Sequence, residues 1–395
     1  MERIIPDIHK ELRNTVINCY RDLHQYPELS FEEVKTASYI CSVLDKNNIP
    51  YRSHIGGYGI VASIEGKNPQ KRTIAIRADM DALPIQEQNE IEYRSKIPHV
   101  MHACGHDAHM ACLIGCALSL NRIKALFEGT LLCVFQAAEE KDPGGAYLML
   151  KDGLFGKTLP NVMLAMHCNA DIPCGSIAIN EGYIMASADE IHIKISGQGG
   201  HGALQHRIND TVLAAAQTLQ GMHLAIAKNR NPFIPSLLSV GRFIADGATN
   251  VIPDEVQISG SLRCMNESER KRLKSLLKEV IMHTAEAFGC KSEIIMNDGY
   301  PCVYNDPEIT RSVRTYAEKL LGKEHILPME PRMTADDFGF FSAIIPSAYF
   351  RLGIQGTGNP NCGGQHTSTF LIDEAALTTG TDILSHLAVQ FLNRE

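Results

Sequence analysis

The sequence lacks any run of about 18 apolar residues, so we expect no helix that spans a membrane. Its beginning, MERIIPDIHKELRN, has charges every few residues and no apolar core, so we expect no signal peptide. Basic residues are not in excess, and the net charge of -8 disfavours nucleic acids and anionic membranes as partners. The 12 cysteines have no regular spacing, which predicts reduced thiols and a cytoplasmic location.

Several catalytic motifs are absent as well. The patterns G-x-S-x-G and H-E-x-x-H and the Walker loop do not occur. GQGGHG, residues 197–202, matches G-x-G-x-x-G, but the predicted helix begins later, near Asn209, and no suitable acidic residue follows about 20 positions on. We therefore reject a dinucleotide site and expect an exposed glycine loop that presents His201.

The length and the apolar runs predict two domains. A chain of 395 residues is too long for one ordinary core, and 44% hydrophobic residues indicate a globular protein. Short apolar runs alternate with turn residues and helical patterns, which predicts an α/β domain with a mostly parallel sheet. The runs are GIVASIEG, TIAIRADMD, TLLCVFQAAEE, VMLAMHC and SAYFRLGI.

Residues 183–297 follow a different pattern. Their predicted strands and helices have the order βαββαβ, which is typical of a ferredoxin-like α+β domain. We therefore predict a larger discontinuous α/β domain, formed by residues 1–182 and 298–395, into which this smaller domain is inserted.

The segment ELSFEEVKTASYICSVLDKNN predicts an early helix with a capping box. Ser30 would cap the helix and Glu33 would reach back to it, so the pair Glu32–Glu33 is expected to be solvated. His24, in the preceding DLHQYPELS, is expected to be a structural histidine in a loop.

Residue types that bind metals gather at the predicted strand ends. Because the carboxyl ends of parallel strands meet at one crevice, we expect these side chains to converge there with MHACGHDAHM, residues 101–110. The convergent candidates are Asp79, Asp81, Cys104, His106, Glu139, Glu140, His167 and, in a glycine-rich loop, His366. His102 and His109 are rival ligands.

The chemistry of these groups favours a pair of metal ions. Thiolate, imidazole and carboxylate suit zinc, manganese, cobalt or nickel better than calcium or magnesium. Adjacent side chains of an extended strand point in opposite directions, so Glu139 and Glu140 need different roles. One would bind an ion, and the other would take a proton from water.

With these residues together, the chain resembles the aminoacylase and carboxypeptidase-G-like family of dinuclear metallohydrolases. Its amidohydrolase branch, which includes hippurate hydrolases, auxin-conjugate hydrolases and N-acetyl-diaminopimelate deacetylases, is the most similar. The resemblance rests on RDLHQYPELSFEE, RADMDALPI, MHACGHDAHM, FQAAEE, GQGGHGA, ATNVIP, TADDFGFF and QH, in this order. The chain departs from many relatives in AAEEKDPGG and in LQH, which ends at His206, and both departures concern loop shape and acyl specificity.

The resemblance implies two divalent metal ions per subunit, Zn²⁺ or Mn²⁺, with Co²⁺ or Ni²⁺ as alternatives. It implies a ligand set of Cys104, His106, Glu140, His167 and His366. Glu139 would be the general base, and Asp79 would orient a ligand imidazole.

The inserted domain would be a lid that also forms a homodimer. It would carry Asn250, which would bind the substrate, and His201, which would stabilise the oxyanion in its own or the partner's site. Arg263 and Arg351 are candidates for binding the substrate carboxylate.

The implied function is hydrolysis of the amide bond of N-acyl amino acids by metal-activated water. A dipeptidase or carboxypeptidase of the same family is the alternative. A binding protein without activity would have a damaged ligand set, which the sequence does not show. Thiol catalysis by Cys104 would be inhibited by alkylation but not by chelation.

Overall fold

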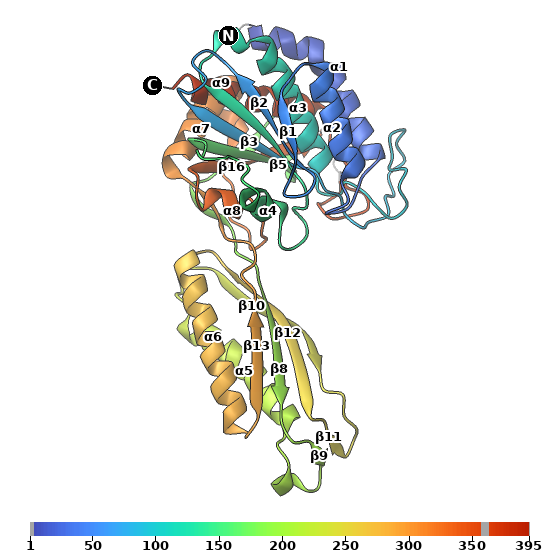
Figure 1. Ribbon diagram of the computed structural model, residues 1–395, viewed down its shortest axis with the longest axis vertical. Helices are drawn as coiled ribbons and strands as arrows, with labels where there is room; N and C mark the ends of the chain where they lie inside the picture. The colour runs from blue at the N-terminus through green and yellow to red at the C-terminus, as the bar shows by residue number, and fades with distance from the viewer. Residues whose placement is uncertain (1–3, 357–362, 395) are drawn as a thin grey trace. The chain divides into compact units, whose positions relative to one another are not determined.

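The computed structural model describes residues 4–356 and 363–394, and the chain divides into two compact units (Figure 1). The first unit consists of Met1–Gly182, Tyr304–Glu330 and Asp336–Glu395, and the second of Tyr183–Val303 and Pro331–Ala335. Residues 298–303 and 331–335, which we assigned to the larger domain, therefore fall in the second unit.

The first unit is built on an eight-stranded sheet with the order β1-β2-β4-β3-β5-β16-β6-β15. The central strands β4, β3, β5 and β16 are parallel, and antiparallel pairs occur between β1 and β2, β2 and β4, and β16 and β6. The strands are β1 (Tyr51–Ile55), β2 (Gly59–Glu65), β3 (Thr73–Asp79), β4 (Thr130–Gln136), β5 (Val162–Pro173), β6 (Ile177–Ala178), β15 (Ile326–Leu327) and β16 (Ser347–Gln355). Two further short strands are β7 (Gly182–Met185) and β14 (Val303–Asn305).

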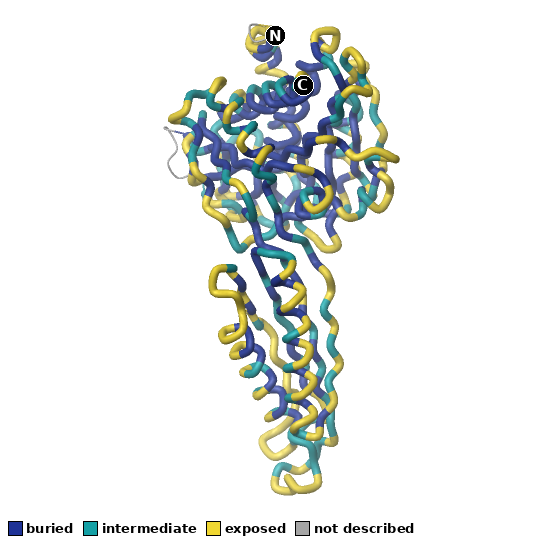
Figure 2. Tube along the Cα trace, turned by 90° about the vertical axis from the view of Figure 1, so that its left-hand side faces the viewer, coloured by how far each residue is buried: buried dark blue, intermediate teal, exposed yellow. Residues whose placement is uncertain are grey.

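Helices bury this sheet. Its helices are α1 (Ile4–Gln25), α2 (Val34–Lys46), α3 (His106–Arg122), α4 (Gly145–Lys151), α7 (Pro307–Leu321), α8 (Gly339–Ser342) and α9 (Ala375–Leu392). Helix α3 lies against β3 and β5, α9 lies against β16, and α1 packs on both α3 and α9. Because α3 is buried along nearly its whole length, its sequence has no polar stripe. Figure 2 shows that buried residues fill the interior of this unit.

Helix α2 begins without the predicted capping box. Glu33 occupies the N-cap position, but its side chain makes no cap hydrogen bond, and it is buried. The Glu28 carboxylate caps the helix instead, since it accepts hydrogen bonds from the backbone amides of Lys35 at 3.1 Å and Thr36 at 2.8 Å. The capping box of Ser30 and Glu33 and the solvated Glu33 were therefore wrong predictions, because a carboxylate earlier in the chain reaches the same amides.

The second unit has the predicted βαββαβ order. Its elements are β8 (Asp189–Ser196), α5 (Thr211–Asn229), β10 (Ser236–Ile244), β12 (Glu255–Cys264), α6 (Glu267–Ala287) and β13 (Lys291–Met296). The strands form an antiparallel sheet in the order β10-β12-β8-β13. Alternate residues of β8, namely Ile191, Ile193 and Ile195, are buried in a core shared with both helices.

The predicted fold class, an α/β unit with a mostly parallel sheet and a smaller α+β unit, is confirmed. In the part of the chain that the structure describes, no helix has the length and apolarity needed to cross a bilayer.

Candidate metal centre

The parallel strands bring polar side chains to one level of the sheet. Asp79, at the end of β3, pairs with Gln136 at the end of β4. His167 of β5 pairs with Arg351 of β16, and the register between β3 and β5 places Asp79 level with His167. The predicted convergence is therefore present, although His167 lies inside β5 and not at its end, because the strand continues to Pro173.

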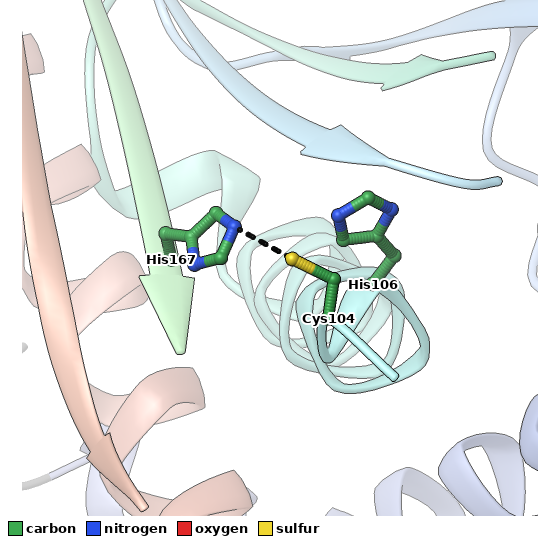
Figure 3. Close-up of side chains that lie close together, drawn as sticks. All are labelled: Cys104, His106 and His167. Carbon is green, nitrogen blue, oxygen red and sulfur yellow. Dashed lines mark hydrogen bonds between the residues drawn. The ribbon is translucent and has the colours of Figure 1, made fainter. Parts of the chain in front are cut away.

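The residues before α3 place a thiol beside two imidazoles. The Cys104 Sγ lies 3.5 Å from His167 Nε2, and Figure 3 shows both side chains with His106. The ligand atoms of these three residues lie within 4.8 Å of one another. Gly105 makes this approach possible: its φ is 91°, and a Cβ atom there would lie 2.9 Å from the Cβ of Cys168.

Both imidazoles present a lone pair to the thiol. His106 Nδ1 lies 2.8 Å from the carbonyl oxygen of Asp81, and His167 Nδ1 lies 2.8 Å from that of Cys168. A carbonyl oxygen can only accept, so each Nδ1 donates its proton, and in the neutral ring Nε2 carries the lone pair that a metal ion would use. His106 Nε2 is buried and has no hydrogen-bond partner. A buried nitrogen lone pair without a donor, beside a thiol, fits a bound metal ion.

A second group shares the same thiol. Cys104, Glu140 and His366 also have ligand atoms within 4.8 Å of one another, and His366 Nε2 lies 3.0 Å from Glu140 Oε1. The His366 backbone amide donates to the Ala103 carbonyl at 2.8 Å, which ties its loop to the segment before α3. His366 has a φ of 63°, a left-handed conformation that is uncommon outside glycine.

Carboxylates gather around these ligand groups. Glu139 forms a further group with His106 and Glu140. Burial raises the pKa of Glu139 well above its usual value, and the carboxylates of Asp336 and Glu140 raise it further. Burial, followed by the carboxylates of Glu140 and Glu139, also raises the pKa of the Cys104 thiol. A divalent cation would oppose both effects, because it favours the charged forms of these groups.

One buried guanidinium faces three of the nearby carboxylates. Arg77 donates to Asp79 at 2.6 Å, to Asp336 at 3.2 Å and to Asp337 at 2.9 Å. Burial alone would raise the pKa of Asp79, but the charge of Arg77 and the hydrogen bond from His109 hold it well below its usual value. Arg77, Asp336 and Asp337 were not predicted as site residues. A charged residue within the apolar pattern of a buried strand, as in TIAIRADMD, is the signal that could have identified Arg77.

Asp79 orients a histidine that we considered a rival ligand. Its Oδ1 lies 2.5 Å from His109 Nδ1, whereas its Oδ2 lies 3.7 Å from His106 Nε2. His109 Nε2 accepts a hydrogen bond from the Cys168 backbone amide at 2.8 Å. Both nitrogens of His109 are thus occupied, which argues against a ligand role. Asp79 therefore contacts His109 most closely, and its predicted role in orienting a ligand imidazole stays a prediction.

A second set of buried charges lies beside α3. His24 Nδ1 lies 2.6 Å from Asp107 Oδ2, and His24 Nε2 lies 3.1 Å from Glu87 Oε1. Burial disfavours the charged imidazole, but the two carboxylates raise the pKa of His24 to about 9. His24 lies in the last turn of α1 and contacts two carboxylates. The predicted loop position was therefore wrong. The rival ligand His102 is buried nearby, and burial lowers its pKa to about 4.

The remaining predicted site residues lie in the second unit. His201 and Asn250 are exposed neighbours: His201, in β9 (Gly200–His201), pairs with Val251 of β11 (Val251–Ile252), the residue after Asn250. Arg263 donates from Nη1 to the Met333 carbonyl at 3.0 Å. The structure thus brings together all the predicted site residues of the first unit, while these three belong to a separate unit.

A buried cysteine, imidazoles and carboxylates at the carboxyl ends of parallel strands define a metallohydrolase type of site. Residues 75–390 match the pattern of Peptidase family M20/M25/M40. The chain is 35% identical over 372 residues to the N-acetyldiaminopimelate deacetylase of Enterococcus faecalis, covering 94% of this chain and 96% of that one. It is 32% identical over 397 residues to thermostable carboxypeptidase 1 of Saccharolobus solfataricus, covering 100% and 99% of the two chains.

The chain is also similar to a solved structure. The Bacillus subtilis YXEP protein, a dinuclear metal binding peptidase from the M20 family, has a TM-score of 0.83 and 32% identity, covering 97% of this chain and 99% of that one. The chain therefore belongs to Peptidase family M20/M25/M40. The predicted family resemblance and the class of metallo-amidohydrolase are confirmed, and the protein is a hydrolase of amide bonds.

Proposed function

We propose that this protein hydrolyses the amide bond of N-acyl amino acids, with Glu139 as the general base. One observation carries the proposal: the Sγ of the buried Cys104 lies within 4.8 Å of ligand atoms of His106 and His167, and also of Glu140 and His366. The similarity to a deacetylase supports a substrate in which an acyl group is bonded to the amine nitrogen. The similarity to a carboxypeptidase keeps peptide hydrolysis as the second candidate.

The two ligand groups support a pair of divalent ions. Cys104, His106 and His167 would hold one ion, and Cys104, Glu140 and His366 would hold the other. Bound ions would polarise the substrate carbonyl, lower the pKa of a water molecule and offset the charge of the surrounding carboxylates. The thiolate ligand favours zinc, and manganese, cobalt and nickel are the alternatives.

Glu139 would transfer the proton. It is buried and forms a group with His106 and Glu140, so it lies beside the ligands without being needed in either group of three. Its carboxylate would accept a proton from water as the water oxygen bonds to the carbonyl carbon. The same proton would then pass to the nitrogen as the C–N bond breaks, which releases a carboxylate and an amine.

The predictions for the second unit remain proposals. Residues 183–297 would close over the site as a lid and form a homodimer. His201 would stabilise the oxyanion, Asn250 would bind the substrate, and Arg263 would bind the substrate carboxylate. The cytoplasmic location also remains a prediction.

Replacement of Glu139 by Gln tests the proposed function. We expect Glu139→Gln to bind metal like the wild type and to lose about 100- to 10,000-fold in kcat, because only the proton acceptor is removed. Glu32→Gln, at an exposed glutamate, is the control. Turnover of N-acetyl and N-benzoyl amino acids and of dipeptides is measured together with the metal content.

Near-normal turnover by metal-loaded Glu139→Gln would refute the proton-transfer role. A higher kcat/KM of the wild type for dipeptides than for N-acyl amino acids would favour the second candidate.

A further inference from the structure

The turn after β4 presents both glutamates on an uncommon backbone conformation. Ala138 is buried and has a φ of 52°, in the left-handed region that residues with a Cβ rarely adopt. The conformation of this residue sets the direction in which Glu139 and Glu140 leave the strand. The interactions that hold Ala138 in place therefore bear on both side chains.

Two carboxylates hold this turn by its backbone amides. The Ala138 amide donates to Glu33 Oε1 at 2.7 Å, and the Glu140 amide donates to Asp81 Oδ2 at 2.9 Å. The Ala138 carbonyl accepts from the Gly145 amide at 2.8 Å. The amides on both sides of Glu139 are thus bound to acidic side chains from other parts of the chain.

The Glu33 side chain does not cap the helix that it precedes. Its side chain makes no cap hydrogen bond, and Glu28 performs that function. Glu33 is 0% exposed, and its Oε2 has no hydrogen-bond partner. Burial and the Asp81 carboxylate raise the pKa of Glu33 to about 7. Burial of an acidic side chain is unfavourable for folding. Because Glu33 does not cap the helix, its contact with Ala138 is the interaction that this buried side chain supplies.

The same segment also supports the second carboxylate. The Ser30 hydroxyl donates to Asp81 Oδ2 at 2.7 Å, and the Ala82 amide donates to the Glu28 carbonyl at 2.8 Å. Residues 28–33, the motif ELSFEE, therefore connect the loop after β3 to the turn after β4.

We propose that Glu33 is a positioning residue for hydrolysis: it holds Ala138 in the left-handed conformation and thereby directs Glu139 and Glu140. Asp81, supported by Ser30, holds the other side of the turn. This inference rests on the proposed function of the two glutamates. An amide needs only a lone pair from its partner, so Glu33 has to supply an acceptor oxygen and not a negative charge.

Two variants of Glu33 separate the acceptor from the side-chain volume. Glu33→Gln keeps a carbonyl oxygen, Glu33→Met removes it at similar length, and Glu32→Met is the control at the exposed neighbour. The readouts are kcat and KM, the visible spectrum of the Co²⁺-loaded protein, Co²⁺ affinity by competition with a chelator, and the midpoint of thermal unfolding.

We expect Glu33→Met to lose about 10- to 100-fold in Co²⁺ affinity and in kcat, with an altered Co²⁺ spectrum and little change in KM. Glu33→Gln, which keeps the acceptor oxygen, should have a Co²⁺ affinity and a kcat close to those of the wild type. Wild-type affinity, spectrum and kcat in folded Glu33→Met would overturn the proposal. Equal losses in the Gln and Met variants would also overturn it, because the acceptor would then not matter.

A milder variant covers a failure of Glu33→Met to fold. Glu33→Asp keeps a carboxylate but shortens the side chain that reaches the Ala138 amide, and a reduced Co²⁺ affinity supports the proposal while an unchanged affinity overturns it. The proposed function fails separately, if the wild type binds no Co²⁺ or Glu139→Gln retains its turnover. If both of these behave as expected and Glu33→Met is normal, only the positioning role is lost.

Discussion

Buried carboxylates occur in both units of the molecule, but their charges are balanced differently. In the second unit, Asp189 accepts two hydrogen bonds from Arg270 at 2.7 Å and one from Lys274 at 2.9 Å. In the first unit, Arg77 faces three carboxylates, and Glu139 and Glu140 lie beside imidazoles whose Nδ1 atoms already carry their protons.

This difference distinguishes buried charges that are satisfied within the protein from buried charges that need a bound metal ion. A buried ion pair whose hydrogen bonds are all made within the protein requires only the fold. A buried set of acids, a thiol and nitrogen lone pairs without enough positive charge is unfavourable by itself, and a cation stabilises it. The balance of charge therefore indicates the first unit as the place where metal binds.

Removal of metal should abolish activity and destabilise the first unit but not the second, and this is the largest effect that we expect. We expect a chelator to abolish activity, and Zn²⁺, Mn²⁺ or Co²⁺ to restore it. An ion at about 1,000 times its Kd should stabilise the folded state by about 4 kcal/mol. Hydrogen exchange should locate this protection in residues 101–122 and 134–146 and not in residues 255–281. Equal protection of both units, or of neither, would contradict the comparison.

Replacement of Asp189, whose charge is balanced by Arg270 and Lys274, should destabilise only the second unit. Asp189→Leu leaves Arg270 and Lys274 without their shared buried acid, at an expected loss of about 3–5 kcal/mol. Hydrogen exchange of β8 and β12 measures the loss, and metal affinity should stay unchanged. Lys194→Gln, which breaks an exposed pair with Glu293, is the control and should not alter exchange. Weakened metal binding in Asp189→Leu would show that the two clusters are coupled.

Replacement of His24, which lies between Asp107 and Glu87, should cause the smallest loss of stability. This loss should depend on pH. The folded pKa of about 9 lies above the ordinary value of 6.5, so the folded state keeps a proton that the unfolded state releases. The resulting stability, at most about 3 kcal/mol, is fully present below about pH 6.5 and is lost as the pH rises through about 9.

Urea unfolding midpoints with a chelator present check this prediction. The difference between the wild type and His24→Gln should shrink from pH 6 to pH 9.5. His223→Gln, at an exposed position on α5, should show no such trend. A difference that stays constant with pH would mean that His24 is neutral in the fold.

Much of the architecture could be predicted because periodicity is a local property. The apolar runs that became β2, β3, β4, β5 and β16 were identified from the sequence, and so was the order of elements in the second unit. The convergence of Cys104, His106 and His167 followed from the geometry of parallel strands.

Pairs of similar residues show where local patterns stop being informative. Glu32 and Glu33 are adjacent acids, yet one is exposed and the other is 0% exposed and bound to Ala138. His106 and His109 lie one helical turn apart, yet only His109 has both nitrogens occupied, by Asp79 and the Cys168 amide. In each pair, the partner that distinguishes the two residues comes from a distant part of the chain.

The sequence by itself determined the kinds of elements, their order and the set of chemical groups at the strand ends, because each of these depends on neighbouring residues. Only the tertiary structure decided which lone pairs stay unpartnered and which acid holds the turn at Ala138. The physical reason is that a hydrogen bond depends on distance in space, and Glu33 and Ala138 are brought to 2.7 Å only when the chain has folded.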